Sequence, residues 1–397
     1  MAKTYFKTWS KQIDQKPDLT MSAVEGPYFL TEDEKWLADL SSISYQAAFG
    51  HHHEYIANKI VEQTHLFCVA NPKAVFELKT RASERLLDYL DLPEAGRLFY
   101  TLSGAESVEN ALKMARQLTQ KKIILCRQRS YHGASLGALS ITGDWRNPLH
   151  FTVDEWTVRI PEPADDPDLS KTREIILKTG VENICGFCLE TVTGGNGVII
   201  PDQEWWSGIQ ALCDEFKLML IADEVICAFH RLGAPTGTAL FNLKPDMVCL
   251  AKAITGGMVP FGALWVAERH AKTYDHDLVL SQGLTSYAHP LGLAAMEGVL
   301  DLLTDQEFQI HLKAITKIFH DFFLAIAEFP IVKETRVLGL LGAVDLHSPI
   351  SQESLHEKGL HLIHFPDRLM LAPAYTFTED QLSEHLADLA DLLERVQ

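Results

Sequence analysis

The feature that most constrains the fold is an alternation of short apolar segments with amphipathic segments between residues 97 and 266. Segments such as KIILC and ICGFCLE are apolar at almost every position, so both faces of each strand are expected to be buried. In AESVENALKMARQL the apolar side chains fall on one helical face, namely Val108, Ala111, Leu112 and Ala115. This alternation predicts an α/β fold with a mostly parallel sheet covered by helices on both sides.

Further strands are predicted at RLFYTLS, LMLIA, MVCLA and FGALWVA, and a further amphipathic helix at EWWSGIQALCDEF. After about residue 295 the pattern changes. A helix that begins near Pro290 is followed by the strands VLGLLGAVDL and RLMLAPAY. A last helix begins at TEDQLSEHL, where Thr378 and Gln381 have the spacing of a capping box.

We therefore expect a large domain over residues 46–295 and a smaller α+β domain over 296–397, which the N-terminal segment 1–45 joins. A chain of 397 residues is long enough for two domains, and a ligand is expected where they meet.

Composition excludes several classes of protein. The formal net charge of −18 argues against a general affinity for nucleic acid or for an anionic membrane. We find neither an apolar signal core at the N-terminus nor an apolar run of the roughly 20 residues that a membrane helix needs. Seven cysteines without a framework suit reduced thiols, so a cytoplasmic location is expected.

Two clusters resemble metal sites, and we predict no metal at either. Cys185 and Cys188 form a C-x-x-C, but a zinc ribbon needs a second such pair, and the segment has the pattern of a buried strand. The adjacent histidines of HHHEY, at 51–55, are expected to diverge in a loop or to form one wall of a pocket.

Polar side chains fall where predicted strands stop, at Ser103, Glu190, Asp223 and Lys252. In sheets of this kind, ligands bind outside the carboxyl ends of the strands. These residues are therefore the candidates for a site.

Lys252 is the one charged residue in MVCLAKAITGGMVPFGALW. A buried amine either costs several kcal/mol or loses its proton, and a neutral amine is a nucleophile towards carbonyl groups. The alternative is that Lys252 ends a strand with its ammonium group in water.

The segment Ser103-Gly104-Ala105 turns from a strand into a helix. Free backbone N–H groups and the helix dipole make such a turn a candidate anion site. The alternative is an ordinary helix start, because Ser103 and Glu106 have the spacing of a capping box.

Asp223 ends the apolar strand LMLIA, where a carboxylate is costly to bury without a cationic partner. A helix cap or a surface ion pair is the alternative. Together, an anion site, a carboxylate and an amine match the phosphate, ring nitrogen and aldehyde of pyridoxal 5'-phosphate.

With these features the chain resembles the class III aminotransferases, a subgroup of the fold type I pyridoxal-phosphate enzymes. The resemblance covers nearly the whole chain and rests on five segments in the family's order: SGAESVENALKMAR, YHGASLGALSITG, ADEVICAFHRLG, LAKAITGGMVPFGA and SYAHPLGLAAMEGVL. It implies a mostly parallel seven-stranded sheet between helices, with a smaller α+β domain, in a homodimer whose subunits share active sites.

The resemblance also implies roles for single residues. Lys252 would form the Schiff base with the cofactor and move the proton, and Asp223 would keep the ring nitrogen protonated. Val225 and Tyr131 would pack on the two ring faces, with His132 and Gly133 shaping the loop after Tyr131.

The phosphate would be held by Ser103, Gly104 and Ala105, with Thr285 supplied by the other subunit. Glu190 would orient the site, and Tyr45 would lie at the pocket mouth.

Three departures from the family concern the substrate. The acidic residue and arginine that pair in ornithine and 4-aminobutyrate enzymes correspond to Gly195 and Met370. The glutamine that faces the cofactor ring hydroxyl corresponds to Ile226. Arg368 is the candidate for gripping a substrate carboxylate, or else it faces solvent.

The sequence thus predicts an aminotransferase that moves an amino group from an ω-amine or amino acid donor to a keto acid or aldehyde. An aminomutase, decarboxylase or lyase of the same fold is the alternative within the cofactor class. A cofactor-binding protein without turnover is the alternative from another class.

Overall fold

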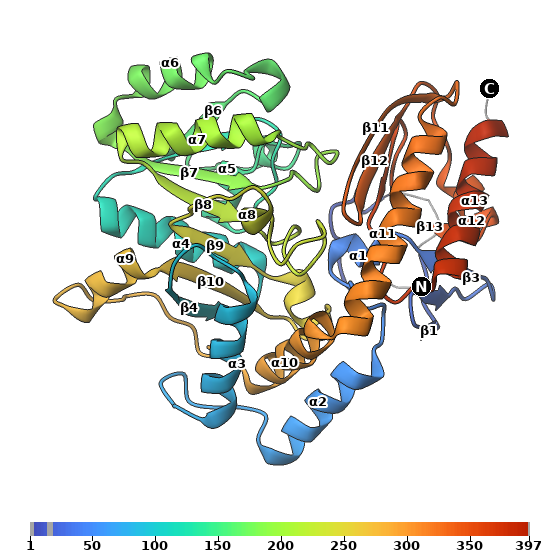
Figure 1. Cartoon of the computed structure of the whole chain (residues 1–397), viewed down its shortest axis with the longest axis horizontal. Coiled ribbons are helices and arrows are strands. Elements are labelled where there is room, and N and C mark those ends of the chain that lie inside the picture. Colours follow the sequence, from blue (N-terminus) through green and yellow to red (C-terminus); the bar gives the residue numbers. More distant parts are fainter. Residues whose placement is uncertain (1–3, 14–18, 396–397) are drawn as a thin grey trace.

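The computed structural model describes residues 4–13 and 19–395, which form two parts side by side (Figure 1). One part contains a seven-stranded sheet and the other contains two four-stranded sheets. The predicted domains 1–45 and 296–397 include residues 1–3, 14–18 and 396–397, which lie outside the described residues.

The seven-stranded sheet has the strand order β4-β10-β9-β8-β7-β5-β6. Only β10 runs antiparallel to its neighbours, which confirms the predicted mostly parallel sheet. Every strand predicted between residues 97 and 266 is present. The bounds are β4 Gly96–Thr101, β5 Ile123–Arg127, β6 Thr157–Ile160, β7 Ile184–Glu190, β8 Met219–Asp223, β9 Met247–Leu250 and β10 Gly262–Ala267.

Strand β6 has no counterpart in the sequence prediction. Its residues TVRI lie at the sheet edge, where three of the four are only partly buried, so the segment lacks the apolar run of the central strands.

Helices cover both faces of this sheet, as the alternation predicts. On one face, helix α4 (Gly104–Thr119) packs Val108 and Leu112 against a cluster that includes Cys249. On the other face, helix α7 (Gln203–Phe216) packs Trp206 and Ile209 with the residues around β7. The remaining helices of this part are α2 Glu54–Leu66, α3 Glu77–Tyr89, α5 Leu136–Ile141, α6 Ser170–Thr179, α8 Gly237–Leu240 and α9 Glu268–Ala271.

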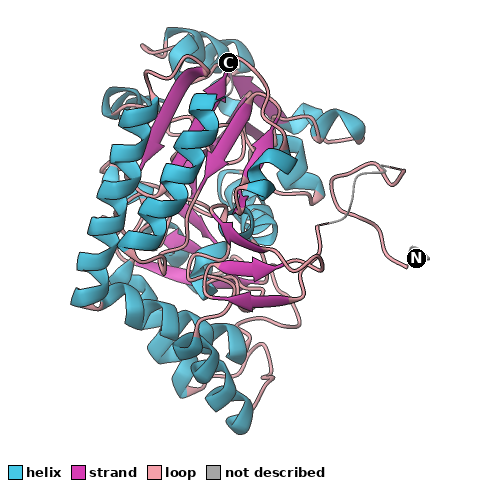
Figure 2. Ribbon diagram, turned by 90° about the vertical axis from the view of Figure 1, so that its right-hand side faces the viewer, coloured by secondary structure: helices cyan, strands magenta, loops and turns pink. Residues whose placement is uncertain are grey.

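Helix α10 (Pro290–Thr304) lies between the two parts, packs on α2 and α3, and leads into α11 (Gln306–Ile326) (Figure 1). The C-terminal part then adds β11 Val332–Leu338, β12 Leu341–Leu346, α12 Gln352–Glu357, β13 Leu360–His361, β14 Ile363–Phe365, β15 Arg368–Leu371 and α13 Glu379–Arg395. Seen from the side, helices flank the strands of both parts (Figure 2).

The predicted single strand VLGLLGAVDL is wrong, because the chain turns back on itself inside it. Strand β11 ends at Leu338 and β12 begins at Leu341 as its antiparallel partner. Gly339 has a φ of 58°, which glycine adopts freely, so it provides the turn.

The capping box predicted for the last helix is confirmed. Gln381 N donates to Thr378 Oγ1 over 3.2 Å, and Thr378 N donates to Gln381 Oε1 over 3.0 Å. The box predicted at Ser103 forms with one change: Glu106 N donates to Ser103 Oγ, while the Glu106 carboxylate accepts from Leu102 N.

A small sheet ties the two ends of the chain together. Strands β1 (Ala23–Glu25), β2 (Tyr28–Leu30) and β3 (Trp36–Asp39) pair in sequence, and β3 pairs in parallel with β13. The register places His361 opposite Asp39. After β3 a short turn, α1 (Ser42–Tyr45), leads back towards the large sheet.

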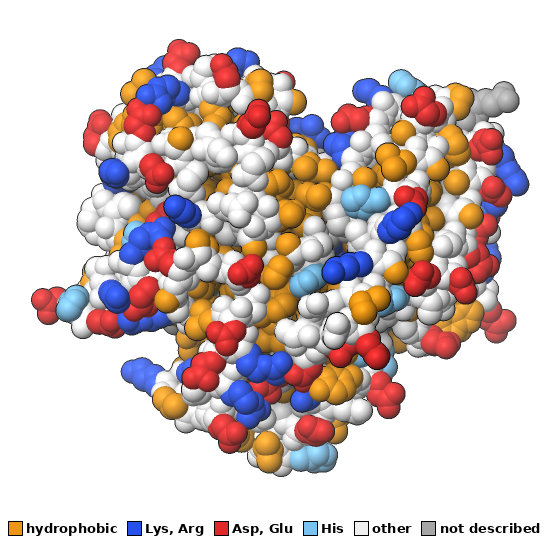
Figure 3. All heavy atoms as spheres, viewed as in Figure 1, with side chains coloured by type: hydrophobic (Ala, Val, Ile, Leu, Met, Phe, Trp, Pro, Cys, Tyr) orange, Lys and Arg blue, Asp and Glu red, His pale blue; other side chains and the backbone are white. Residues whose placement is uncertain are grey.

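The surface carries charges of both signs (Figure 3), and the two strand cysteines lie in the interior. On the face seen in Figure 3, acidic and basic side chains are interspersed, and apolar side chains gather where the two parts meet. Cys185 and Cys188 are buried within β7, and the described residues contain no cluster of metal-ligating side chains. Within the described ranges, no helix combines the length and apolar character needed to span a membrane.

Candidate active site

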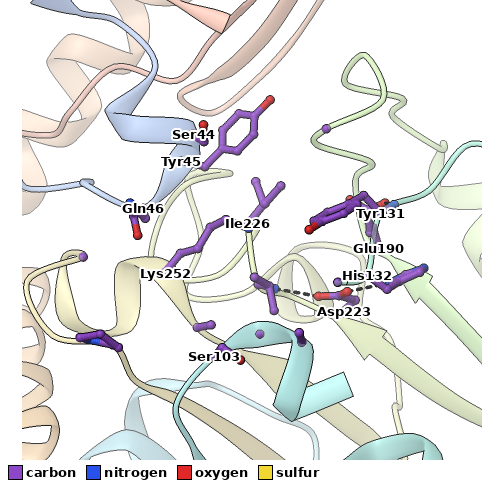
Figure 4. A pocket seen from close by; sticks show the side chains of 18 of the residues that line it. Ser44, Tyr45, Gln46, Ser103, Tyr131, His132, Glu190, Asp223, Ile226 and Lys252 are labelled. Atoms are coloured by element: carbon purple, nitrogen blue, oxygen red, sulfur yellow. Dashed lines mark hydrogen bonds and ion pairs between the residues drawn. The ribbon is translucent and has the colours of Figure 1, made fainter. Parts of the chain in front are cut away.

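A cavity of about 500 Å³ opens at the carboxyl ends of β8 and β9, next to the start of α4 (Figure 4). Its floor comes from the large sheet. Its other walls come from the segment 44–46 and from Ile363, Phe365 and Met370 of the C-terminal part. The cavity therefore lies where the two parts of the molecule meet.

Lys252 lies on the wall of this cavity, two residues after β9 ends. It begins a short 3₁₀ helix, η5 (Lys252–Thr255), and has a φ of 49°, a left-handed conformation that is unfavourable for a side chain of this kind. Burial lowers the pKa of the Lys252 amine, and the nearby carboxylates of Asp223 and Glu190 oppose that shift without cancelling it. The site therefore favours the neutral amine more than water does.

Asp223 is the last residue of β8, and its side chain lines the same cavity while only 3% of the residue is exposed. Its Oδ2 lies 2.7 Å from His132 Nδ1, and its Oδ1 accepts from Val225 N over 3.1 Å (Figure 4). These contacts fix the orientation of the carboxylate.

Glu190 ends the neighbouring strand β7, opposite Asp223 in the register. Burial raises the pKa of Glu190, and the negative charge of Asp223 adds to the rise. Its oxygens accept from Tyr131 N and Gly194 N over 3.1 and 3.0 Å, so it holds two loops that line the cavity.

The first turn of α4 faces the cavity with Ser103, Gly104 and Ala105. A Cβ on Gly104 would lie 2.8 Å from Val225 Cγ1, so only glycine fits between the helix and that side chain. Val225 and Tyr131 also line the cavity.

The predicted substrate residues differ in their placement. Tyr45 lines the cavity, is 5% exposed, and donates to Met370 Sδ over 3.7 Å. Arg368 does not line the cavity. Its guanidinium pairs with Asp345 and lies next to Gly197. Thr285 is exposed in the loop before α10 and lies outside the cavity of its own chain.

Arg146 lines the cavity and is absent from the residues that the sequence singles out. Its guanidinium lies 4.6 Å from the ring centroid of Tyr131 and 5.4 Å from that of Trp9. It pairs with Asp144 through Nη1, while its Nε is buried without a hydrogen-bond partner. Ser44, Gln46, Ile363 and Phe365 also line the cavity without having been predicted.

The arrangement suits a ligand with an aldehyde, a cationic ring nitrogen and a phosphate. An amine whose pKa is lowered by burial, an oriented carboxylate and a helix N-terminus lie on the walls of one cavity. These residues fit pyridoxal 5'-phosphate.

Comparison with known proteins places nearly the whole chain in one family. Residues 10–393 match the family described as aminotransferase class-III. The solved taurine:2-oxoglutarate aminotransferase from Bifidobacterium kashiwanohense, in complex with PLP and glutamate, is 30% identical, with a TM-score of 0.91 over 98% of this chain and 94% of that one.

Two further proteins that are similar in sequence are also aminotransferases. An omega-aminotransferase of Caulobacter vibrioides is 27% identical over 95% of this chain and 93% of its own. A mitochondrial gamma-aminobutyrate transaminase of Oryza sativa subsp. indica is 27% identical over 96% of this chain and 82% of its own.

Proposed function

Because the chain belongs to the class-III aminotransferases and is a pyridoxal-phosphate-dependent transaminase, we propose that its amine donor is an ω-amino acid with an acidic far end. Such a donor carries a carboxylate or a sulfonate away from the reacting amine. A keto acid is the proposed acceptor, since donor and acceptor must use one cavity in turn.

The position of Arg146 carries this proposal. A guanidinium held over aromatic rings is fixed in direction and keeps its N–H groups for an anion. Asp144 pairs with Nη1, and Nε is buried beside the cavity without a hydrogen-bond partner. A guanidinium is well matched to a carboxylate or sulfonate because it donates two parallel hydrogen bonds.

Similarity to the taurine:2-oxoglutarate aminotransferase supports this substrate class, since taurine and 2-oxoglutarate both carry acidic groups. Arg368 takes no part in the proposed clamp, because Asp345 already pairs with it.

When bound, pyridoxal phosphate supplies a carbonyl carbon that takes up the amino group and a ring that accepts electrons. Lys252 would hold it covalently and would carry the proton that leaves the substrate carbon. The carboxylate of Asp223 would face the ring nitrogen, with His132 fixing its direction. Tyr131 and Val225 would exclude water from the two ring faces.

The phosphate would lie on the N–H groups of Gly104 and Ala105 beside the Ser103 hydroxyl. Thr285 of the partner subunit would complete this cradle in a homodimer. The exposed position of Thr285 and the apolar side chains exposed after α2, such as Val69 and Val75, support an assembly of two chains.

We also propose the division into a segment 1–45, a large domain 46–295 and a small domain 296–397. The small sheet that pairs β3 with β13 supports it, because it joins the N-terminal segment to the C-terminal part.

The test compares donors in the absence of an acceptor, with cofactor absorbance reporting amine uptake. We expect β-alanine or taurine to react with kcat/KM at least ~10-fold above that of propylamine, because only the acidic donors engage Arg146. In Arg146→Gln, the value for the acidic donors should fall by roughly 100-fold, while propylamine changes little.

Arg173→Gln is the matched control. Arg173 also lies over an aromatic ring, that of Phe216, and pairs with Glu215, but it lies outside the cavity. Equal use of acidic and neutral amines by the wild type, or a loss in Arg146→Gln that is the same for both donors, would refute the proposed substrate class.

A further inference from the structure

One wall of the cavity is built from a backbone conformation that side-chain-bearing residues rarely adopt. Ser42, Ile43, Ser44 and Tyr45 have φ values of 48°, 46°, 55° and 75°. A left-handed turn of four non-glycine residues is strained, and Ile43 adds a β-branched side chain to it. Such a conformation persists only where the surroundings hold it.

The group that holds this turn is the carboxylate of Asp39, the last residue of β3, which is 1% exposed. Its Oδ1 accepts from Ser41 N over 2.9 Å and from Ser41 Oγ over 2.6 Å. Its Oδ2 accepts from Ile43 N over 2.8 Å and lies 3.2 Å from His51 Nε2. Both oxygens are therefore used, and the carboxylate bridges the start and the middle of the turn.

A second anchor ties the turn to the C-terminal part. Ser42 Oγ donates to Ala372 O over 2.6 Å, and Ala372 N donates to Leu40 O over 2.7 Å. The same region contributes Met370 to the cavity wall, where it accepts from the Tyr45 hydroxyl.

The strained turn points its last residues at the reacting centre. Ser44, Tyr45 and Gln46 all line the cavity, and Figure 4 shows them on the side facing Lys252 and Ile226. A relaxed, right-handed path through residues 42–45 would turn these side chains away, since φ changes sign at four consecutive positions.

We propose that Asp39 is a positioning residue for the substrate: its buried carboxylate keeps the turn left-handed and so places Ser44, Tyr45 and Gln46 against the bound amine. Asp39 contacts neither the cavity nor Lys252 and acts only through the turn. The proposal rests on the transaminase site described above and does not depend on the acidic character of the donor.

The test is Asp39→Asn, which keeps the shape of the side chain but removes one of its two acceptor oxygens. With any donor that the wild type converts, we expect KM to rise roughly 10-fold or more and kcat to fall less, because substrate contacts are displaced while Lys252 and Asp223 stay in place. Cofactor affinity, measured by titration of the apoenzyme, should stay within about threefold.

Asp166→Asn is the matched control. Asp166 is also 1% exposed and accepts from Lys171 N, Thr172 N and Thr172 Oγ1, but it lies outside the cavity. It should lower the melting temperature without moving KM. A KM that is unchanged in Asp39→Asn, or that rises equally in Asp166→Asn, would overturn the proposal.

A rescue separates positioning from general damage. Glycine adopts positive φ freely, so Ile43→Gly added to Asp39→Asn should return KM most of the way to the wild-type value. If Asp39→Asn does not fold, Ser42→Ala removes the second anchor and should raise KM about threefold. An unchanged KM in that variant counts against the proposal.

These outcomes are distinct from failure of the proposed substrate class. A wild type that converts only neutral amines would refute the acidic donor, and the KM comparison would still be made with the neutral amine.

Discussion

At the scale of single residues, Lys252 destabilises the folded protein in the absence of cofactor. Burial lowers the pKa of its amine below the ordinary 10.5, so the folded apoenzyme binds its proton less tightly than the unfolded chain does. Stability therefore rises with pH between the lowered pKa and 10.5.

We predict that Lys252→Met removes this pH dependence. The apo variant should be more stable than the wild type near pH 7.5, and this gain in the free energy of unfolding should shrink as pH approaches 10.5. Urea unfolding of both apoproteins from pH 7.5 to 10 measures the difference. A gain that grows with pH would contradict the lowered pKa.

The same variant should lose turnover by at least ~1,000-fold, because no other amine among the residues that line the cavity replaces the nucleophile. Borohydride treatment of the wild-type holoenzyme should leave cofactor mass on the peptide that contains Lys252. The variant should bind cofactor but retain none after denaturation.

The site residues that directly follow a strand could be predicted from the sequence. Ser103, Glu190, Asp223 and Lys252 follow apolar runs, and parallel strands bring their carboxyl ends to one edge, where the structure places all four. Arg146 and Trp9 could not be found in this way, because they lie in segments whose path depends on tertiary packing.

At the scale of elements, the N-terminus of α4 has two duties, as a capped helix end and as the proposed phosphate site. Ser103→Ala removes the cap bond from Glu106 N and should lower the free energy of unfolding by about 1 kcal/mol. We predict that cofactor affinity also falls, by roughly 3- to 10-fold, because Ser103 lines the cavity.

Thr378→Ala is the control, since Thr378 caps α13 with the same geometry outside the cavity. It should cost similar stability and leave cofactor affinity unchanged. Equal affinity in both variants would restrict Ser103 to a capping role.

The elements themselves were predictable where local sequence and burial agree. The central strands of the large sheet and helices α4 and α7 have apolar patterns that match their environments. The β11–β12 hairpin was missed because one glycine interrupts a continuous apolar run. The left-handed turn at Ser42–Tyr45 was missed because Asp39, rather than local preference, imposes it.

At the scale of the whole molecule, the fold places the site between its two parts. Thr285 does not line the cavity of its own chain. An apolar surface is exposed around the end of α2 and the loop that follows, where Leu66 is 74%, Val69 73% and Val75 85% exposed. Exposed apolar surface of this kind is typical of an interface, and the homodimer proposed above would cover it with a second copy of the chain.

We predict that Leu66→Asp weakens the proposed dimer enough for sedimentation to detect monomer at micromolar concentration, because a buried unpaired carboxylate costs several kcal/mol. Cofactor affinity should fall with it, since the monomer lacks Thr285 of the partner subunit. Leu324→Asp is the matched control, because Leu324 is 73% exposed on α11, and it should change neither property. A wild-type monomer that binds cofactor as tightly as it does at high protein concentration would show that each chain completes its own site.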